Sequence, residues 1–371
     1  KKMNKIKTSS MEELKKFIDD KSFNKIFIIA GNQSFNLSGL KKFFQDIKNK
    51  NIKFFFKVNP YPKYEELIKI TNEIALFSPD LIIAAGGGSV IDYAKISNVI
   101  NLDSKTILNI KNSSCKLKNS NRKLLAIPTT AGSGAEVTSN AVIYINDVKY
   151  SVEGELIKPD YFFLIPDFII GASMKIKASA GFDAIAQAIE SLMSRKSNNN
   201  SVEFAKKSLN LSLKHFTNFV LKPNQENTCA MSLAANLSGK AISISKTTAP
   251  HAVSYPFTAL FNISHGHAVS LTLNKFMIYN FKNSHSSSVN FNLKERFNTL
   301  FYLTKTKNIE DFNSFLLNIT KEAKLENDFN KLGIDINSSI SKILTDINDQ
   351  RLSNNPVTLD KEIIKNLLIK S

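Results

Sequence analysis

Cysteine is scarce in this sequence, and long apolar runs are missing from it. The two cysteines among 371 residues, Cys115 and Cys229, are too few for a disulfide framework or a thiolate metal cluster, which points to a reducing cytoplasm. No apolar run approaches the roughly 18 residues of a membrane helix, and the opening stretch KKMNKIKTSSMEELKK is too polar for a signal peptide. We therefore expect a cytoplasmic protein that does not contact a membrane.

Arginine is also scarce, although the chain is strongly basic. The net charge of +17 comes almost entirely from lysine, because the only arginines are Arg122, Arg195, Arg296 and Arg351. A nucleic-acid-binding surface usually clusters its cations and favours arginine, whereas these lysines are spread along the chain. The composition therefore argues against a nucleic acid partner and favours a small anionic substrate.

The apolar residues divide the chain into two parts. From residue 25 to about residue 168, short strand-like runs alternate with amphipathic helical patterns, which predicts a parallel sheet with right-handed crossovers. From residue 169 onward the patterns are almost all helical. We therefore predict a Rossmann-like α/β nucleotide-binding domain over residues 1–168 and an all-α domain over residues 169–371. Two later runs are expected to add a pair of strands that closes the first domain, VIYINDVKYSV and YFFLIPD.

The first chemical motif is DLIIAAGGGSVIDYAKI, in which a buried strand runs into glycines at the start of a helix. Gly86, Gly87, Gly88 and Ser89 would let the backbone approach a phosphate, and the helix N-terminus offers free N–H groups. Asp92 lies in the first turn of that helix, where it either lines a cofactor site or favours the helix dipole. Taken alone, the motif fits a phosphate site and a tight strand-to-helix turn equally well.

A second loop follows another strand, in LLAIPTTAGSGAEVT. It presents Thr129, Thr130 and Ser133 among glycines at the carboxyl end of that strand. The carboxyl ends of parallel strands lie at one edge of a sheet, where α/β proteins bind nucleotides. Two such loops in one sheet favour a dinucleotide over a chance pair of turns.

Histidines gather in TTAPHAVSYPFTALFNISHGHAV, which contains His251, His265 and His267. A helix and the loop after it can bring His251 and His265 together. With Asp183 they would supply one oxygen and two nitrogen ligands, a set that suits zinc or ferrous iron. Any one of these histidines alone is better explained as a core residue hydrogen-bonded to the backbone, but the set predicts a metal site.

Several of these motifs, in this order and spacing, resemble the iron-containing (group III) alcohol dehydrogenases. The resemblance covers nearly the whole chain and rests on GGGSVID, IPTTAGSGAEVT, AGFDAIAQAIE, PHAVSYPFTALFNISHGH and RLSNNPV. It implies a dehydroquinate-synthase-like fold, a nicotinamide cofactor on the N-terminal domain, one divalent metal, and a homodimer. The implied metal ligands are Asp183, His251 and His265. The implied cofactor contacts are Gly87, Gly88, Ser89, Thr129, Thr130 and Lys149.

The sequence departs from the family at Gln187. The usual Asp-x-x-x-His helix reads Asp183-Ala-Ile-Ala-Gln187 here, and a glutamine carbonyl is a poorer ligand than imidazole for either metal. Three outcomes are open: Gln187 ligates weakly, or Asp183, His251 and His265 hold the metal with water as in the related zinc-dependent glycerol dehydrogenases, or the metal site is lost. The departure makes zinc a stronger candidate than iron for the bound metal.

A second departure is Tyr255, where relatives often place a further histidine near the nicotinamide. His267 is the catalytic residue that we expect to take over the proton relay. A third feature is Gly31, at the position where NAD-specific relatives carry an aspartate that binds the ribose 2′-hydroxyl. Glycine followed by small polar residues resembles the NADPH-using members, so NADPH is favoured over NADH.

The substrate prediction rests on SISKTTAPHAVSYP. It puts Lys246, Thr247 and Thr248 just before His251, where typical alcohol-oxidising relatives are small and apolar. A lysine and two hydroxyls suit an anionic group such as a phosphonate, and the stretch resembles the phosphonoacetaldehyde reductases, which make 2-hydroxyethylphosphonate. The alternative is that Lys246 is a solvated helix residue.

Other functions stay open. The chain resembles general short-chain alcohol or butanol dehydrogenases in the same motifs. A metal-dependent lyase or cyclase, which uses its cofactor transiently as dehydroquinate synthase does, is possible on the same fold. A non-catalytic lysine-rich binding protein is the third alternative.

Overall fold

The computed structural model describes residues 7–20, 23–347 and 349–369. The chain forms two compact units, each built from two separate stretches of sequence. The first unit contains the residues up to Ser173 together with Pro223–Asn236, and the second contains Met174–Lys222 and the residues from Leu237 onward. No sequence pattern indicated that part of a later helix belongs to the first unit. Among the described residues, no helix is long and apolar enough to cross a membrane.

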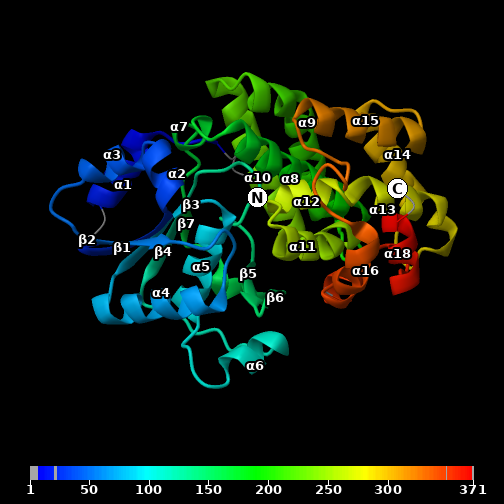
Figure 1. Ribbon diagram of the computed structural model, residues 1–371. Helices are drawn as coiled ribbons and strands as arrows, with labels where there is room; N and C mark the ends of the chain where they lie inside the picture. The colour runs from blue at the N-terminus through cyan, green and yellow to red at the C-terminus, as the bar shows by residue number, and fades with distance from the viewer. Residues whose placement is uncertain (1–6, 21–22, 348, 370–371) are drawn as a thin grey trace. The chain divides into compact units, whose positions relative to one another are not determined.

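A five-stranded parallel sheet organises the first unit (Figure 1), as the sequence predicts. Its interior strands are buried on both faces, which explains why they are nearly continuous apolar runs. The edge strand β2 instead alternates between exposed and partly buried residues. The strand order is β2 (Asn51–Lys57), β1 (Lys25–Gly31), β3 (Leu81–Gly86), β4 (Lys123–Pro128) and β7 (Tyr161–Phe162).

Alternate strand residues face two separate apolar cores. Ile26, Ile28 and Ala30 pack with α1 (Met11–Asp20), α2 (Asn32–Leu37) and α3 (Leu40–Gln45). Phe27 and Ile29 pack with α4 (Tyr64–Phe77) and α5 (Gly88–Val99). Figure 1 shows these two groups of helices on opposite sides of the sheet. The arrangement leaves the carboxyl ends of β3 and β4 to carry the glycine-rich loops.

The two later runs do not form one added pair, which corrects that detail of the prediction. The first run forms an antiparallel hairpin in a separate sheet, with β5 (Asn140–Ile145) and β6 (Val148–Glu153), while β7 from the second run joins the main sheet beside β4. Asn146 and Asp147 both have left-handed backbone angles, with φ of 50° and 62°, as a two-residue hairpin turn requires. The remaining helices of this part are α6 (Thr106–Lys111) and α7 (Asp167–Ile170).

The described residues of the second unit form helices and no strand, as predicted. Its central helix is α8 (Met174–Met193), buried along most of its length and packed against α9 (Asn199–Leu221), α12 (His265–Ser270) and α14 (Leu293–Thr304). Another core joins α11 (Ala249–Phe261) with α12 and three further helices, α13 (Leu273–Lys282), α16 (Ile336–Thr345) and α18 (Lys361–Ile369). The other helices are α10 (Gln225–Ser245), which spans both units, α15 (Ile309–Glu322) and α17 (Asp349–Leu352).

Candidate functional site

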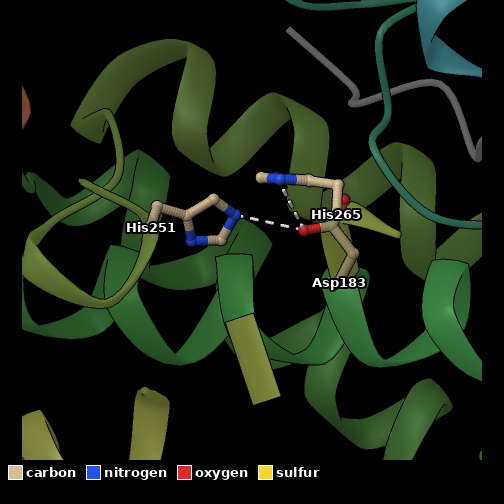
Figure 2. A group of neighbouring side chains, drawn as sticks. All are labelled: Asp183, His251 and His265. Carbon is tan, nitrogen blue, oxygen red and sulfur yellow. Dashed lines mark hydrogen bonds and ion pairs between the residues drawn. The ribbon is translucent and has the colours of Figure 1, made fainter. Parts of the chain in front are cut away.

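Three side chains of the second unit converge as the sequence predicts. Asp183 comes from α8, His251 from the first turn of α11, and His265 from the first residue of α12. The Oδ1 atom of Asp183 lies 3.1 Å from Nε2 of His251 and 3.5 Å from Nε2 of His265. Figure 2 shows both imidazole rings directed at this one carboxylate oxygen. One ligand atom from each residue lies within 4.8 Å of the others, so the group can hold a metal ion.

The burial of this group is uneven. His251 is 2% exposed and Asp183 is 3% exposed, whereas the His265 side chain is 37% exposed. Burial by itself lowers the pKa of His251, but the carboxylates of Glu190 and Asp183 outweigh it and raise that pKa to about 9. The surroundings therefore favour the positively charged form of His251. The exposed His265 makes the group accessible to solvent on its side.

Glu190 is the member of this site that sequence reasoning left without a role. It lies two turns after Asp183 on α8, and one of its oxygens makes a very short contact with Nδ1 of His251. The other oxygen accepts hydrogen bonds from the backbone N–H groups of Thr248 (3.0 Å) and His251 (3.3 Å), and from the Thr248 hydroxyl (2.9 Å). Glu190 thus caps α11 and turns Nε2 of His251 toward Asp183. The seven-residue spacing from Asp183 was the available signal.

Gly266 sets the position of His265. A Cβ atom built there would lie 1.8 Å from the Ser179 carbonyl oxygen and 3.0 Å from Cβ of Asp183. Only glycine therefore allows the start of α12 to approach α8 this closely. The Ser179 hydroxyl also accepts a hydrogen bond from the backbone of His267 at 3.2 Å.

Gln187 lies on the same face of α8 as Asp183 and is 4% exposed. Its amide nitrogen donates to Oδ2 of Asp183 at 3.2 Å, and its carbonyl oxygen accepts from the Ser238 hydroxyl at 3.0 Å. Gln187 and Asp183 therefore share one helix face and are hydrogen-bonded to each other. Whether Gln187 ligates a metal stays a prediction at this point.

Tyr255 and His267 lie near the convergent group in different ways. The Tyr255 ring stacks on that of His265, with centroids 5.6 Å apart. The ring of His267 instead binds the Glu326 carbonyl oxygen through Nε2 at 2.7 Å, and burial lowers its pKa. A neutral imidazole with one nitrogen bound to the backbone fits a structural role, and the proton relay of His267 stays a prediction.

The predicted substrate residues occupy the turn between α10 and α11. Lys246 closes α10 in the left-handed conformation, with φ of 59°, and its N–H donates to the Ile242 carbonyl at 2.8 Å. Thr248 gives its hydroxyl to Glu190, so it acts on the cap of α11. Thr247 is 6% exposed and forms a side-chain hydrogen bond with Tyr255.

The two glycine-rich loops of the first unit meet as predicted. Their strands β3 and β4 are adjacent, and the Thr129 N–H donates to the Gly86 carbonyl at 3.0 Å. A Cβ atom on Gly87 would lie 3.3 Å from Oγ1 of Thr130, and one on Gly88 would lie 2.7 Å from the Ser133 hydroxyl. A side chain at Gly88 would displace the Ser133 hydroxyl, and one at Gly87 would crowd Thr130. The two glycines therefore let the loops touch and leave the backbone at the start of α5 without side chains at these positions.

Thr129 carries a polar atom that the rest of the described chain does not satisfy. The residue is 3% exposed, and its Oγ1 has no hydrogen-bond partner among the described residues. A buried hydroxyl without a partner is costly, so it points to a ligand that would bind there. Ser89 lies in the first turn of α5, and both Ser89 and Thr130 are partly exposed.

Asp92 lies on α5, and the charge of Lys149 acts on its carboxylate. A carboxylate oxygen of Asp92 accepts the Val142 N–H at 3.1 Å, and burial raises the pKa of Asp92 to about 6 against the opposing charges of Lys95 and Lys149. Lys149 lies on β6. Asp92 therefore ties α5 to the β5–β6 hairpin, and a direct contact of either residue with a cofactor stays a prediction.

Gly31 ends β1 and precedes α2, so it lies at the same edge of the sheet as the other loops. A Cβ atom there would lie 3.0 Å from the Ser34 hydroxyl, which donates to the Gly31 carbonyl at 3.1 Å. No carboxylate occupies this strand end, where one would repel a 2′-phosphate.

Both halves of the chain match the same protein family. The description "Iron-containing alcohol dehydrogenase" matches residues 4–166, and "Fe-containing alcohol dehydrogenase family, C-terminal" matches residues 177–371. The phosphonoacetaldehyde reductase of Streptomyces viridochromogenes is 27% identical over 227 residues, which cover 58% of this chain and 57% of that protein. The NADPH-dependent butanol dehydrogenase of Clostridium saccharobutylicum is 29% identical over 282 residues, covering 74% of this chain and 71% of that protein.

Solved structures confirm the expected dehydroquinate-synthase-like fold. The sulfoacetaldehyde reductase from Bifidobacterium kashiwanohense, solved with NAD⁺, superposes with a TM-score of 0.83 at 22% identity, covering 97% of this chain and 94% of that one. At this identity the likeness shows the fold alone. The curated match to the Streptomyces reductase spans little more than half of that enzyme.

Proposed function

Since this chain belongs to the iron-containing alcohol dehydrogenase family, we propose that it is a metal-dependent, NAD(P)H-linked aldehyde reductase and alcohol dehydrogenase. The observation that carries the proposal is the convergence of Asp183, His251 and His265 on one point. The finer proposal is that the substrate is phosphonoacetaldehyde, reduced to 2-hydroxyethylphosphonate. A general short-chain alcohol or butanol dehydrogenase is the alternative.

The convergent residues fit a divalent metal, either Fe²⁺ or Zn²⁺. One carboxylate oxygen and two imidazole nitrogens are ligands that both ions accept. Glu190 supplies the carboxylate that a metal-binding histidine usually has behind it. A bound divalent ion would polarise an aldehyde carbonyl and stabilise negative charge that develops on its oxygen.

The loops of the first unit fit a nicotinamide dinucleotide. The backbone of Gly87, Gly88 and Ser89 at the start of α5 would hold the pyrophosphate, and Oγ1 of Thr129 would find a partner in the cofactor. The absence of a carboxylate at Gly31 supports NADPH over NADH, and one relative carries an NADPH-dependent name. The nicotinamide would supply the hydride.

The protein's own residues orient and enclose the reacting groups. Glu190 and Gly266 fix the directions of His251 and His265, as their contacts with α11 and α8 require. The Tyr255 ring covers one face of His265 and limits access of water there. His267 is the residue that we propose for proton relay, through a change in its contact with the Glu326 carbonyl.

The phosphonate proposal rests on two cationic residues, Lys246 and Arg351, in the segments next to Thr247 and Tyr255. Lys246 lies in the turn that leads into α11, next to Thr247, which bonds Tyr255. Arg351 on α17 is 7% exposed. Its positive charge lowers the pKa of the Tyr255 hydroxyl, against the larger effect of burial, which raises that pKa. The guanidinium is therefore close enough to Tyr255 to act on it electrostatically. Asn354 fastens this segment to the turn by donating to the Ser245 and Thr247 carbonyls at 2.8 and 2.9 Å. Lysine and arginine are the residues that suit an anionic headgroup, which supports the phosphonate proposal.

The first experiment follows NADPH absorbance with purified protein, zinc or ferrous iron, and either phosphonoacetaldehyde or butanal. Fast loss with the phosphonate alone supports the finer proposal. Lys246→Met should then raise KM for phosphonoacetaldehyde about tenfold and leave butanal unchanged, because one charge-assisted contact is lost. The exposed Lys207→Met is the matched control.

Other results of the same experiment decide between the alternatives. Comparable rates with both aldehydes would support a general dehydrogenase and leave Lys246 as surface charge. Net oxidation of NADPH would exclude a lyase or cyclase that uses its cofactor only transiently. No turnover with either aldehyde under any metal would overturn the proposal. We also propose a homodimer, to be tested by the mass of the protein in solution.

A further inference from the structure

The two carboxylate oxygens of Asp183 have different partners. Oδ1 faces the two histidines, at 3.1 Å from Nε2 of His251 and 3.5 Å from Nε2 of His265. Oδ2 accepts the side-chain N–H of Gln187 at 3.2 Å. The carboxylate is therefore held in one rotation, with a single oxygen turned toward the imidazoles.

The orientation of the Gln187 amide follows from its two neighbours. A carboxylate oxygen can only accept, so the group that faces Asp183 must be the amide NH₂. The Ser238 hydroxyl can donate, and it lies 3.0 Å from the Gln187 carbonyl oxygen. The reversed amide would place its carbonyl oxygen against the carboxylate oxygen and leave two acceptors facing each other. All three side chains are at most 4% exposed, so water cannot readily replace either hydrogen bond.

We propose that Gln187 is a positioning residue that aims Oδ1 of Asp183 at the two histidines, and that it is not itself a metal ligand. This inference rests on the proposed function, because it assumes that Asp183, His251 and His265 bind a divalent ion. Coordination by Gln187 would have to turn its carbonyl away from Ser238 and break the hydrogen bond to Asp183. Both losses would occur in a buried site, where leaving a polar group unpaired is unfavourable.

Three protein ligands instead of four have a chemical consequence. A site with three ligands leaves more of the coordination sphere to groups from outside the protein. It also binds a metal less tightly than the same site with a further imidazole. Gln187→His should therefore lower Kd for Zn²⁺, although the wild-type residue stabilises the same aspartate.

The test uses Co²⁺ and Zn²⁺ as the probes and measures binding as well as activity. Visible absorption of the Co²⁺-loaded protein reports the number and type of ligands, and competition with a chelator gives Kd for Zn²⁺. Gln187→Met keeps length and removes both hydrogen bonds. We expect its Co²⁺ spectrum to retain the wild-type coordination while Kd for Zn²⁺ rises about tenfold to a hundredfold, as for other residues that orient a ligand.

Gln187→His is the second variant, and we expect it to change the Co²⁺ spectrum and tighten Zn²⁺ binding. The exposed Gln45→Met serves as the matched control and should change neither measurement. A Gln187→Met spectrum that shows the loss of one ligand would overturn the inference but leave the proposed function intact. If wild-type protein binds neither ion, the proposed function and this inference fail together.

A measurement on the wild-type protein covers the case in which Gln187→Met does not fold. In crystals of the Zn²⁺-loaded protein, the Gln187 carbonyl oxygen should remain within hydrogen-bond distance of the Ser238 hydroxyl. A carbonyl oxygen in the coordination sphere of the zinc would overturn the inference.

Discussion

Two helices, α5 and α8, carry charged side chains into the interior of their units. The partners of these charges differ between the two helices. On α5, Lys95 is fully buried, and its ammonium donates to the Ala135 carbonyl (2.8 Å), the Thr138 hydroxyl (2.8 Å) and the Asn140 carbonyl (2.7 Å). On α8, the carboxylates of Asp183 and Glu190 are buried against the imidazole of His251.

The difference separates a structural charge from a functional one. The Lys95 ammonium donates to oxygens between Ala135 and Asn140, so this charge fastens α5 to the end of the second glycine-rich loop and the start of β5. The two carboxylates of α8 face the same imidazole, and a third group, His265, joins them from a partly exposed position. The Lys95 ammonium is a permanent part of the chain and is bound by protein oxygens. The carboxylates of α8 would instead be balanced by a metal ion that can bind and leave.

The largest effect is expected where the charge is structural. Lys95→Met would remove the ammonium donor from the Ala135 carbonyl and the Thr138 hydroxyl, and one of two donors from the Asn140 carbonyl. We expect it to lower the free energy of unfolding by about 3–5 kcal/mol, because several buried hydrogen bonds to a charged group are lost. Urea denaturation measures this change. The exposed Lys207→Met should shift it by less than about 0.5 kcal/mol. Equal stability of both variants would mean that Lys95 is not the fastening that its contacts indicate.

The next effect concerns the functional charge. Asp183→Asn keeps the size of the side chain but replaces the proposed carboxylate ligand, toward which both histidines point, with a neutral amide. We expect Kd for Zn²⁺ to rise by about a hundredfold or more, while unfolding of the metal-free protein changes less than in Lys95→Met. Chelator competition and urea denaturation provide the two numbers. An unchanged Kd would contradict the assignment of Asp183 as a ligand.

A smaller effect is expected at the residue that caps α11. Glu190→Gln keeps a hydrogen-bond acceptor for Thr248 and for the backbone of His251 but removes the charge beside the imidazole. We expect Kd for Zn²⁺ to rise about tenfold to a hundredfold, the range found for groups that orient a metal-binding histidine. The Co²⁺ spectrum should keep its ligand number, and a lost ligand would show that Glu190 itself coordinates.

A pH dependence of stability is also expected in the first unit. Burial raises the pKa of Asp92 from 3.8 to about 6, so the folded state keeps a proton that the unfolded state has lost. The free energy of unfolding should therefore fall as pH rises from about 4 to about 6, by less than about 3 kcal/mol because the side chain is partly exposed. Asp92→Asn should flatten that part of the profile in urea titrations. A steeper slope in the variant would contradict the shift.

The Thr129 hydroxyl allows a fine test of the nucleotide loops. Thr129→Val keeps the shape and removes a buried oxygen that has no partner among the described residues, so the cofactor-free protein should be as stable as wild type or more stable. NADPH affinity should fall by about tenfold if that oxygen bonds the cofactor. Fluorescence titration with NADPH measures it, with Thr299→Val on the surface of α14 as the control.

The sequence by itself determined the order of the elements and the chemistry of the two candidate sites. Continuous apolar runs from Lys25 to Pro128 specify buried parallel strands, because only such strands are apolar on both faces. Two glycine-rich strand ends predict a nucleotide site at one edge of the sheet. The residue types Asp183, His251 and His265 supply the oxygen and nitrogen donors that a metal ion accepts, and the sequence alone gives these types.

Only the tertiary structure decided which of the polar residues are hydrogen-bonded to one another. The role of Glu190 depends on α11 starting against α8, and the direction of the Gln187 amide depends on Ser238 from α10. The pairing of β7 with β4, apart from the β5–β6 hairpin, is likewise a long-range contact. Sequence patterns report which face of an element is buried, but hydrogen-bond partners across helices depend on distances that only packing sets.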